Sequence, residues 1–195
     1  MVTVMGIAAS PRRSGNSTTL LRSVLQGAES KGARTGIVHL NDFVYKGCQA
    51  CKTCSPDGKC IVKDALTPLF AAMHLADILV FASPIYFDGL NGQMKLFFDR
   101  CHHLFYRDGK RKPQLTGKRR AAIIVTYEDK PREEYLKAAG VLAFYLDWMG
   151  DFGEIRIVSE ARLSKADAAS KRPDLLEMAE QLGRQLVDEL QNEKK

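Results

Sequence analysis

The chain has 195 residues, 45% of them hydrophobic, which is enough to bury a full core and predicts a single domain over residues 1–195. Its apolar runs are too short to span a bilayer and its start carries no positively charged leader, so we predict a cytoplasmic protein without a membrane partner. The net charge of +6 is compatible with an anionic partner, but no helix-turn-helix or RNA-binding signature accompanies it, so no nucleic acid is expected.

The hydrophobic pattern predicts strands that alternate with helices along the chain. Continuous apolar runs predict buried strands at 2–9, 35–40, 77–82, 119–126 and 154–159. Apolar residues at helical spacing predict helices at 16–31, 65–75, 92–105 and 132–149, and a last helix that begins at Pro173. Gly150 stands where a glycine that caps the fourth helix is expected. Residues 41–64, the cysteine loop, are expected to be irregular.

Alternation of this kind predicts a doubly wound α/β domain, with right-handed crossovers and helices on both faces of a parallel sheet. Ligands of such domains bind beyond the carboxyl ends of the strands, near the point where the strand order reverses. We therefore expect the chemistry in the loops that follow the first four strands.

The first loop, residues 10–18, joins the first strand to the first helix and is crowded with polar groups. Hydroxyl and amide side chains can donate to phosphate oxygens, arginine can pair with a dianion, and the amides at a helix start carry partial positive charge. Gly15 lets the backbone pass close to a ligand. The Walker A and Gly-x-Gly-x-x-Gly patterns are absent, which disfavours ATP and dinucleotides. A helix cap alone would need only one such residue, so we interpret the loop as a phosphate site.

The segment GIAASPRRSGNST at 6–18 resembles the opening of the NADPH-dependent FMN reductase and iron-sulfur flavoprotein families. The resemblance implies a flavodoxin-like, three-layer α/β/α fold with a five-stranded parallel sheet in the order 2-1-3-4-5, and FMN as cofactor. It also implies assembly as a homodimer or homotetramer, with the flavin near a subunit interface. The residues that it implies as phosphate contacts are Ser10, Arg12, Asn16, Ser17 and Thr18.

The segment SPIYFDGLNGQMK at 83–95 follows the third predicted strand. Pro84 is expected to stop that strand, and large aromatics in a ligand-facing loop can flank a planar ring, although they more often fold onto the core. The segment resembles the isoalloxazine-binding segment of the same families, which implies flavin contacts from Pro84, Ile85, Tyr86 and Phe87. Asp99 and Arg100 match the families as well, and a structural ion pair explains them equally.

Four of the five cysteines fall in the cysteine loop, with two, two and five residues between them: Cys48, Cys51, Cys54 and Cys60. Three thiolates this close can bind neighbouring corners of a cubane, and a Pro-Asp-Gly turn would return the last one as a fourth ligand. The spacing is similar to the iron-sulfur flavoprotein motif, so we predict a [4Fe–4S] cluster. Structural zinc, a disulfide or thiol switch, and a loop without metal are the alternatives.

The loop after the fourth predicted strand departs from the family pattern, because TYEDKP at 126–131 lacks the glycines expected there. We still expect Thr126 and Tyr127 to touch the flavin. The basic residues between Arg107 and Arg120 could meet the 2′-phosphate of NADPH or an acidic ferredoxin, but a solvated connection explains them more simply. His102 and His103 lack a matching set of metal ligands, and we expect His103 at a surface or interface.

No nucleophile or acid–base constellation stands out, and flavin chemistry needs none, because the ring itself carries hydride and single electrons. We therefore predict an FMN-dependent oxidoreductase of the NAD(P)H-dependent FMN reductase type, in which FMN exchanges electrons with a [4Fe–4S] cluster. NAD(P)H and ferredoxin are the candidate electron donors. The alternatives are an NAD(P)H-dependent FMN or quinone reductase without a cluster, and a non-enzymatic redox carrier or sensor.

Overall fold

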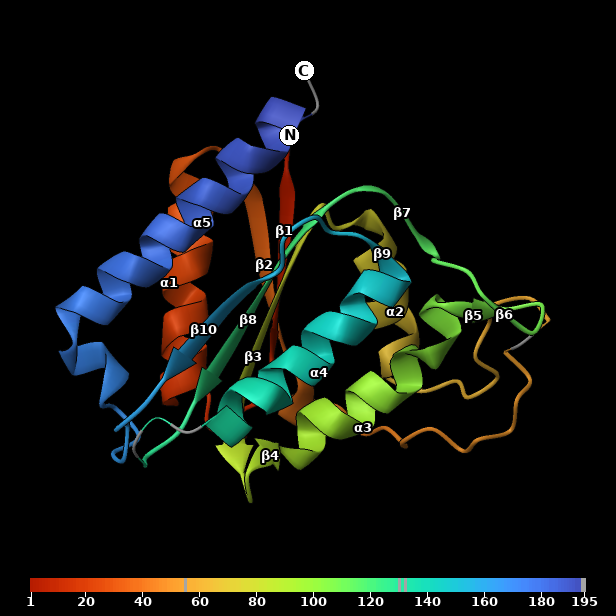
Figure 1. Ribbon diagram of the computed structural model, residues 1–195, viewed down its shortest axis with the longest axis horizontal. Helices are drawn as coiled ribbons and strands as arrows, with labels where there is room; N and C mark the ends of the chain where they lie inside the picture. Colours follow the sequence, from red (N-terminus) through yellow and green to blue (C-terminus); the bar gives the residue numbers. More distant parts are fainter. Residues whose placement is uncertain (55, 130, 132, 194–195) are drawn as a thin grey trace.

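The computed structural model describes residues 1–54, 56–129, 131 and 133–193. Its centre is a parallel sheet in the order β2-β1-β3-β8-β10 (Figure 1), which is the predicted order 2-1-3-4-5 counted over the long strands. These strands are β1 (Thr3–Ala8), β2 (Arg34–His39), β3 (Ile78–Tyr86), β8 (Arg120–Thr126) and β10 (Arg156–Glu160). The doubly wound, three-layer arrangement predicted from the sequence is confirmed.

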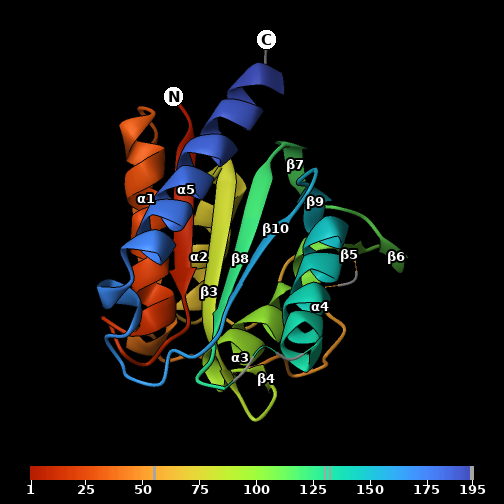
Figure 2. The same ribbon diagram turned by 60° about the vertical axis from the view of Figure 1, so that its left-hand side comes forward.

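Helices cover both faces of the sheet, as Figures 1 and 2 show. One face carries α1 (Asn16–Ser30) and α5 (Pro173–Glu193), and the other carries α2 (Leu66–Leu75), α3 (Gly92–Arg100) and α4 (Glu133–Met149). The alternation of side chains along β3 builds both layers, because Ile78 and Val80 pack with α1 and α5 whereas Leu79 and Phe81 pack with the other helices. A strand that is buried on both faces is apolar throughout, which is why its run was visible in the sequence.

Two glycines allow α1 and α5 to touch backbone to backbone. A Cβ atom at Gly27 would overlap the carbonyl group of Glu180, and a Cβ atom at Gly183 would overlap the carbonyl group of Val24. Any side chain at these positions would push the helices apart, so glycine is required there by packing.

The strand β3 does not stop at Pro84, as predicted, but continues to Tyr86 and turns back into β4 (Gly89–Leu90). On the β1 side the ladder already ends, since Ala8 lies opposite Ala82. The missing N–H of Pro84 points toward that vacated side, so the proline costs the sheet no hydrogen bond. The predicted helix at 92–105 ends earlier, at Arg100, and continues as the 3₁₀ turn η2 (Cys101–Leu104).

Gly150 does not cap α4 in the predicted way. It begins the short strand β9 (Gly150–Asp151), which pairs with β7 (Leu115–Lys118), and its φ is not positive. A Cβ atom here would lie 2.6 Å from the carbonyl oxygen of Leu115, so a close backbone approach requires the glycine. The remaining elements are η1 (Leu40–Asp42), β5 (Tyr106–Arg107), β6 (Lys110–Arg111) and η3 (Ala169–Lys171). No helix in the described ranges is both long and apolar enough to cross a membrane.

We expect Gly183→Ala to lower the free energy of unfolding by about 1–3 kcal/mol, because the new methyl group meets backbone atoms of α1 that cannot move aside. Gly140→Ala on α4 is the matched control, since no atom lies within 4 Å of its Cβ position and alanine favours helix by about 0.5–1 kcal/mol. Urea denaturation of both variants checks this, and equal effects would contradict the packing argument.

Candidate functional site

The candidate site occupies the carboxyl edge of the sheet, at the bottom of Figures 1 and 2. The first loop follows β1 at this edge, the β3–β4 hairpin lies at the end of β3, and the segment that begins at Tyr127 follows β8. The cysteine loop runs out to one side of the same edge, past the end of α3 (Figure 1). The topology therefore gathers the sequence motifs as expected for a doubly wound sheet.

The first loop folds into a tight turn around the Ser10 hydroxyl group. Ser10 is buried, and its Oγ accepts a hydrogen bond of 3.1 Å from the backbone N–H of Arg12. The N–H of Gly15 donates to the carbonyl oxygen of Arg12 at 3.1 Å, and a Cβ atom at Gly15 would lie 2.8 Å from Ser10 Oγ. Glycine thus keeps open a small polar cradle at the start of α1.

Hydrogen-bond donors without a partner lie at the start of α1. Ser17 is 1% exposed, and its Oγ has no hydrogen-bond partner among the described residues. The first backbone N–H groups of α1 have no intrahelical acceptor either, and no side chain caps them. A buried hydroxyl group without a partner is costly, and free N–H groups at a helix start are suited to an acceptor such as a phosphate oxygen.

Arg12, Asn16 and Thr18 have different surroundings. Arg12 is exposed, and its guanidinium forms no ion pair with a described residue, whereas Arg13 pairs with Asp42 at 2.6 Å. The Thr18 hydroxyl donates to the carbonyl oxygen of Arg12 at 3.4 Å. Both amide hydrogens of Asn16 are used, since its Nδ2 donates to the carbonyl oxygens of Leu163 at 2.9 Å and Lys165 at 2.8 Å. Its Oδ1 accepts from the N–H of Ala169 at 2.9 Å, so this side chain holds the 163–169 segment against the first loop.

Asn91 ties the neighbouring segments together, and sequence reasoning missed it. Its buried amide donates to the carbonyl oxygen of Ala9 at 2.7 Å, at the end of β1. Its Oδ1 accepts from Ser83 Oγ at 3.0 Å and from the N–H of Met94 at 3.2 Å, which caps α3. An asparagine directly before a predicted helix was the available signal, because such residues favour the helix N-cap.

A hairpin projects from the end of β3. Phe87 and Asp88 form its two-residue turn, and both have positive φ, 48° and 60°. Positive φ is unfavourable for residues with side chains, so the turn holds Phe87 in a strained conformation with its ring fully exposed. Tyr86 is about half exposed.

A cavity of about 400 Å³, the Tyr127 cavity, lies between this hairpin and the loop after β8. Of the predicted flavin contacts, the cavity brings together Ile85, Phe87 and Tyr127. It adds Tyr135, whose ring lies 4.3 Å from that of Tyr127. Pro84, Tyr86 and Thr126 do not line it, although Pro84 and Thr126 are neighbours in the sheet. Tyr135 was not signalled by the sequence, since it comes from the first turn of a helix that looked amphipathic only.

All four cysteines of the cysteine loop line a second cavity, of about 290 Å³, which we name the cysteine cavity. The thiols are free, and Cys54 Sγ lies 3.6 Å from Nδ1 of His102. Arg100, His103 and Val62 complete the wall on the side of the core. Within the described residues, no three His, Cys, Asp or Glu side chains are arranged to hold a metal ion, so the cavity is not a preformed single-ion site.

Arg100 closes the cysteine loop from inside. Its side chain is 1% exposed and pairs with Asp64, with 2.7 Å between Nη1 and Oδ2. The same guanidinium donates to the carbonyl oxygens of Lys46 at 2.8 Å and Val62 at 3.1 Å, so it binds both ends of the loop. Its Nε is buried without a partner among the described residues. Arg100 of the Asp99–Arg100 motif, which a structural ion pair explained equally, therefore shapes the wall of the cysteine cavity.

The pKa shifts follow from these contacts. Burial alone would raise the pKa of Asp64, but hydrogen bonds from Arg100 and from backbone N–H groups outweigh it and lower that pKa. The stabilisation by this pair is therefore present above the ordinary carboxyl pKa and is lost as the pH falls through the lowered value. Burial raises the pKa of Cys54, whereas a hydrogen bond with Thr53 lowers the pKa of exposed Cys51. Cys51 thus has the greater tendency to form the thiolate that ligates metals.

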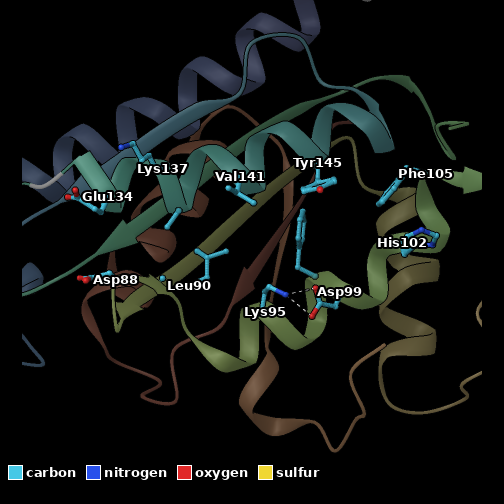
Figure 3. A pocket seen from close by; sticks show the side chains of 13 residues that line it. Asp88, Leu90, Lys95, Asp99, His102, Phe105, Glu134, Lys137, Val141 and Tyr145 are labelled. Atoms are coloured by element: carbon cyan, nitrogen blue, oxygen red, sulfur yellow. Dashed lines mark hydrogen bonds and ion pairs between the residues drawn. The ribbon is translucent and has the colours of Figure 1, made fainter. Parts of the chain in front are cut away.

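A third cavity, a groove of about 820 Å³, lies between α3 and α4 (Figure 3) and borders the two others. Asp88 lines both the groove and the Tyr127 cavity, and His102 lines both the groove and the cysteine cavity. Val141 and Tyr145 of α4 face Leu90 and the Lys95–Asp99 ion pair across it, as the close-up shows. The mostly apolar groove therefore lies between the β3–β4 hairpin and the cysteine cavity.

Known proteins resemble this chain over much of its length. Residues 2–132 match the family model described as NADPH-dependent FMN reductase. An iron-sulfur flavoprotein of Methanocaldococcus jannaschii is 36% identical over 101 residues, which cover 52% of this chain and 52% of the relative. An iron-sulfur flavoprotein of Archaeoglobus fulgidus is 32% identical over 145 residues, which cover 71% of this chain and 64% of the relative. The chain thus spans about half to two thirds of the length of these relatives.

Among solved structures, the NAD(P)H:quinone oxidoreductase from Methanothermobacter marburgensis is similar, with a TM-score of 0.71 at 19% identity. The match covers 95% of this chain and 96% of that one. At this identity the likeness shows the fold, and the function has to be argued from the site.

We expect Arg100→Met to lower the free energy of unfolding by about 3–5 kcal/mol, because it leaves the Asp64 carboxylate without its partner. It should also make the 41–64 segment the first site of cleavage by a protease. Lys95→Met removes an exposed ion pair from the same helix and should cost at most about 0.5 kcal/mol. Similar losses in both variants, measured by urea denaturation, would refute the role given to Arg100.

Proposed function

Because the chain belongs to the NADPH-dependent FMN reductase family, we propose that it is an FMN-dependent oxidoreductase whose cysteine loop carries a [4Fe–4S] cluster. One observation carries the proposal: a helix start with a buried, unpartnered hydroxyl group and a cavity lined by four cysteines lie along the same edge of one sheet. The names of the curated relatives support the cluster. NAD(P)H is the proposed electron donor of the flavin.

The first loop fits the phosphate group of FMN. The Ser17 hydroxyl group and the N–H groups of the first turn of α1 would donate to phosphate oxygens, and the exposed Arg12 would pair with the remaining charge. Ser10 and Thr18 would line the cradle with their hydroxyl groups. Asn16 would contribute its backbone N–H, while its side chain keeps the 163–169 segment in place.

The flavin ring would lie beside the Tyr127 cavity, where FMN, once bound, supplies hydride and single-electron transfer. Ile85, Phe87 and Tyr127 line this cavity, and the ring of Phe87 has no protein contact to lose when it covers a ligand. The backbone at Pro84, Tyr86 and Thr126 runs along the same edge and would border the ring. Tyr127 is held in position by the 3.1 Å contact of its hydroxyl group with Ser159.

The cysteine cavity suits an iron–sulfur cluster better than a zinc ion. The thiolates of a cubane bind different irons, so they need not converge on one point, in agreement with the lack of a single-ion arrangement in the described residues. Arg100 places a buried positive charge in the wall of the cavity, and α3 and η2 close its inner side. The proposed ligands are Cys48, Cys51, Cys54 and Cys60.

The family description also favours a simpler candidate, an NAD(P)H-dependent FMN or quinone reductase in which the cysteine loop is structural, because that description mentions no cluster. A redox carrier or sensor without turnover is the third candidate. Rapid bleaching of the flavin by NADPH without any partner protein would support the simple reductase. Reduction by ferredoxin alone would support the carrier.

We also propose that the chain forms a homodimer or homotetramer through α4 and the α3–α4 groove. Leu136, Val141 and Phe144 of α4 are exposed by 50%, 55% and 55%, a large apolar share for a helix surface. The groove carries charges of both signs, among them Lys95 and Glu134, as a self-complementary two-fold contact requires. Light scattering of the purified protein gives the oligomeric state.

Ser17→Ala should raise the dissociation constant of FMN by about tenfold to a hundredfold, because it removes one charge-assisted hydrogen bond to the phosphate group. It should leave the stability of the apoprotein unchanged or raised, since the hydroxyl group has no partner there. Ser23→Ala, also buried on α1, should leave flavin affinity unchanged. Fluorescence titration with FMN measures both, and unchanged affinity in Ser17→Ala would argue against the phosphate site.

Cys60→Ser, purified without oxygen, should lose most of its iron and sulfide while it retains FMN, because the cavity loses one ligand and the first loop is intact. Cys101→Ser should retain both, since Cys101 is buried outside the cavity with its Sγ 3.6 Å from the carbonyl oxygen of Phe97. Metal analysis and visible spectra provide the readout. Equal iron in Cys60→Ser and wild type would exclude this cysteine as a ligand.

A further inference from the structure

The imidazole ring of His102 belongs to two cavities at once. It lines both the α3–α4 groove and the cysteine cavity, and no other residue in the described part of the chain lines both. The ring comes from η2, the 3₁₀ turn that directly follows Arg100, so the residue that anchors the cysteine loop also fixes the start of this turn. Neither the phosphate site nor the set of proposed cluster ligands uses His102.

Two aromatic rings hold this imidazole in position. The ring centroids of Phe105 and Tyr106 each lie 5.0 Å from that of His102, at interplanar angles of 62° and 42°. Figure 3 shows His102 beside Phe105 at one end of the groove. The N–H of Phe105 donates to the carbonyl oxygen of His102 at 3.3 Å, which closes the turn. A ring that is already held on two sides loses little conformational entropy when it makes one more contact.

That contact is made with a cysteine. Nδ1 of His102 lies 3.6 Å from Sγ of Cys54, within hydrogen-bonding distance for sulfur. A neutral imidazole carries its proton on either ring nitrogen, whereas a thiolate can only accept a hydrogen bond. Because Cys54 has to be a thiolate to bind a metal, the favourable arrangement places the proton on Nδ1 and makes His102 the donor.

The neighbouring histidine does not share this geometry. His103 also lines the cysteine cavity, but its Nδ1 lies 2.8 Å from the carbonyl oxygen of Arg100 and its ring packs edge-on against Phe70. The same side of the cavity holds a further donor, since Nε of Arg100 is buried without a partner among the described residues. The core side of the cavity therefore supplies hydrogen-bond donors, which suits negatively charged sulfur atoms.

We propose that His102 is a positioning residue that donates an Nδ1–H hydrogen bond to the sulfur of Cys54 and thereby raises the reduction potential of a cluster held by the cysteine loop. The inference rests on the proposed cluster. One-electron reduction adds negative charge to the cluster and its sulfur ligands, so a donor to one of these sulfurs stabilises the reduced form more than the oxidised form. Cys48 and Cys51 are exposed and can accept from water, whereas Cys54 lies deeper and depends more on a donor from the protein.

The test compares His102→Leu with His102→Asn. The two new side chains have nearly the same shape, but only asparagine can place an N–H donor close to the position of Nδ1. Each protein is purified without oxygen, and one redox titration, followed by EPR and visible spectra, gives the midpoint potentials of the cluster and of FMN. In His102→Leu the equilibrium constant for one-electron reduction of the cluster should fall about tenfold, which is a shift of about 59 mV to more negative potential. His102→Asn should recover most of that shift.

Two controls accompany the variants. The potential of FMN should be the same in all proteins, because η2 lies beyond the end of α3 that is farther from the β3–β4 hairpin. Tyr106→Phe keeps the ring that packs on His102 and removes only the hydroxyl group, which donates to the carbonyl oxygen of Gly109 at 3.0 Å. This variant should leave the potential of the cluster unchanged.

Equal shifts in His102→Leu and His102→Asn, or no shift in either, would overturn the proposal. Loss of iron from both would also overturn it, because His102 would then be a ligand. If His102→Leu does not fold, pulsed EPR of the reduced wild-type protein with isotope-labelled histidine decides, since a weak nitrogen coupling supports the hydrogen bond and no coupling contradicts it. Iron and sulfide assays separate the two hypotheses. A full cluster with an unshifted potential overturns the role of His102 alone, whereas absent iron in wild type overturns the proposed function and this inference with it.

Discussion

The geometry of the site depends on one buried guanidinium group, that of Arg100. The cysteine loop contains almost no regular structure, and a loop of this length does not keep a shape by itself. Arg100 compensates by binding Asp64 and the carbonyl groups of Lys46 and Val62 from the core side. Burying a charge away from water is costly. The Arg100–Asp64 pair is stable only because the guanidinium group makes all of these contacts at once.

The helix α3 links that loop to the flavin-side segments. Its start is capped by Asn91, which also binds the end of β1 and Ser83, and its end carries Arg100. At about 1.5 Å per residue, a helix of this length separates its two ends by roughly 14 Å. One rigid element therefore sets the spacing between the candidate flavin edge and the cysteine cavity, while the α3–α4 groove runs alongside it.

The sequence was sufficient for features that depend on local patterns. The buried run of β3 and the alternation of strands and helices indicated a doubly wound α/β domain, because apolar periodicity reports burial directly, whereas the sheet order was implied by the family resemblance. The first loop and the cysteine spacing were visible because their residues are close in the chain. Pro84 was misjudged because its tolerance in β3 depends on where another strand, β1, ends. Gly150 was misjudged because its close neighbour is Leu115, which lies far from it in sequence.

Other features could not be predicted because they depend on long-range contacts. Asn16 is engaged by carbonyl groups of residues about 150 positions away, and Arg100 finds Asp64 across 36 positions. The basic residues after Arg107 looked like a solvated connection, and only the fold brings them against the cysteine loop. Composition gives the net charge, but the folded chain decides where that charge acts.

The central claim is that this chain holds an iron–sulfur cluster beside FMN. The most direct measurement is the iron, sulfide, zinc and flavin content of the wild-type protein purified without oxygen, together with its visible spectrum. The account predicts about four iron and about four sulfide per chain, with bound FMN and no zinc. Zinc in place of iron, or a full complement of FMN with neither metal, would contradict it.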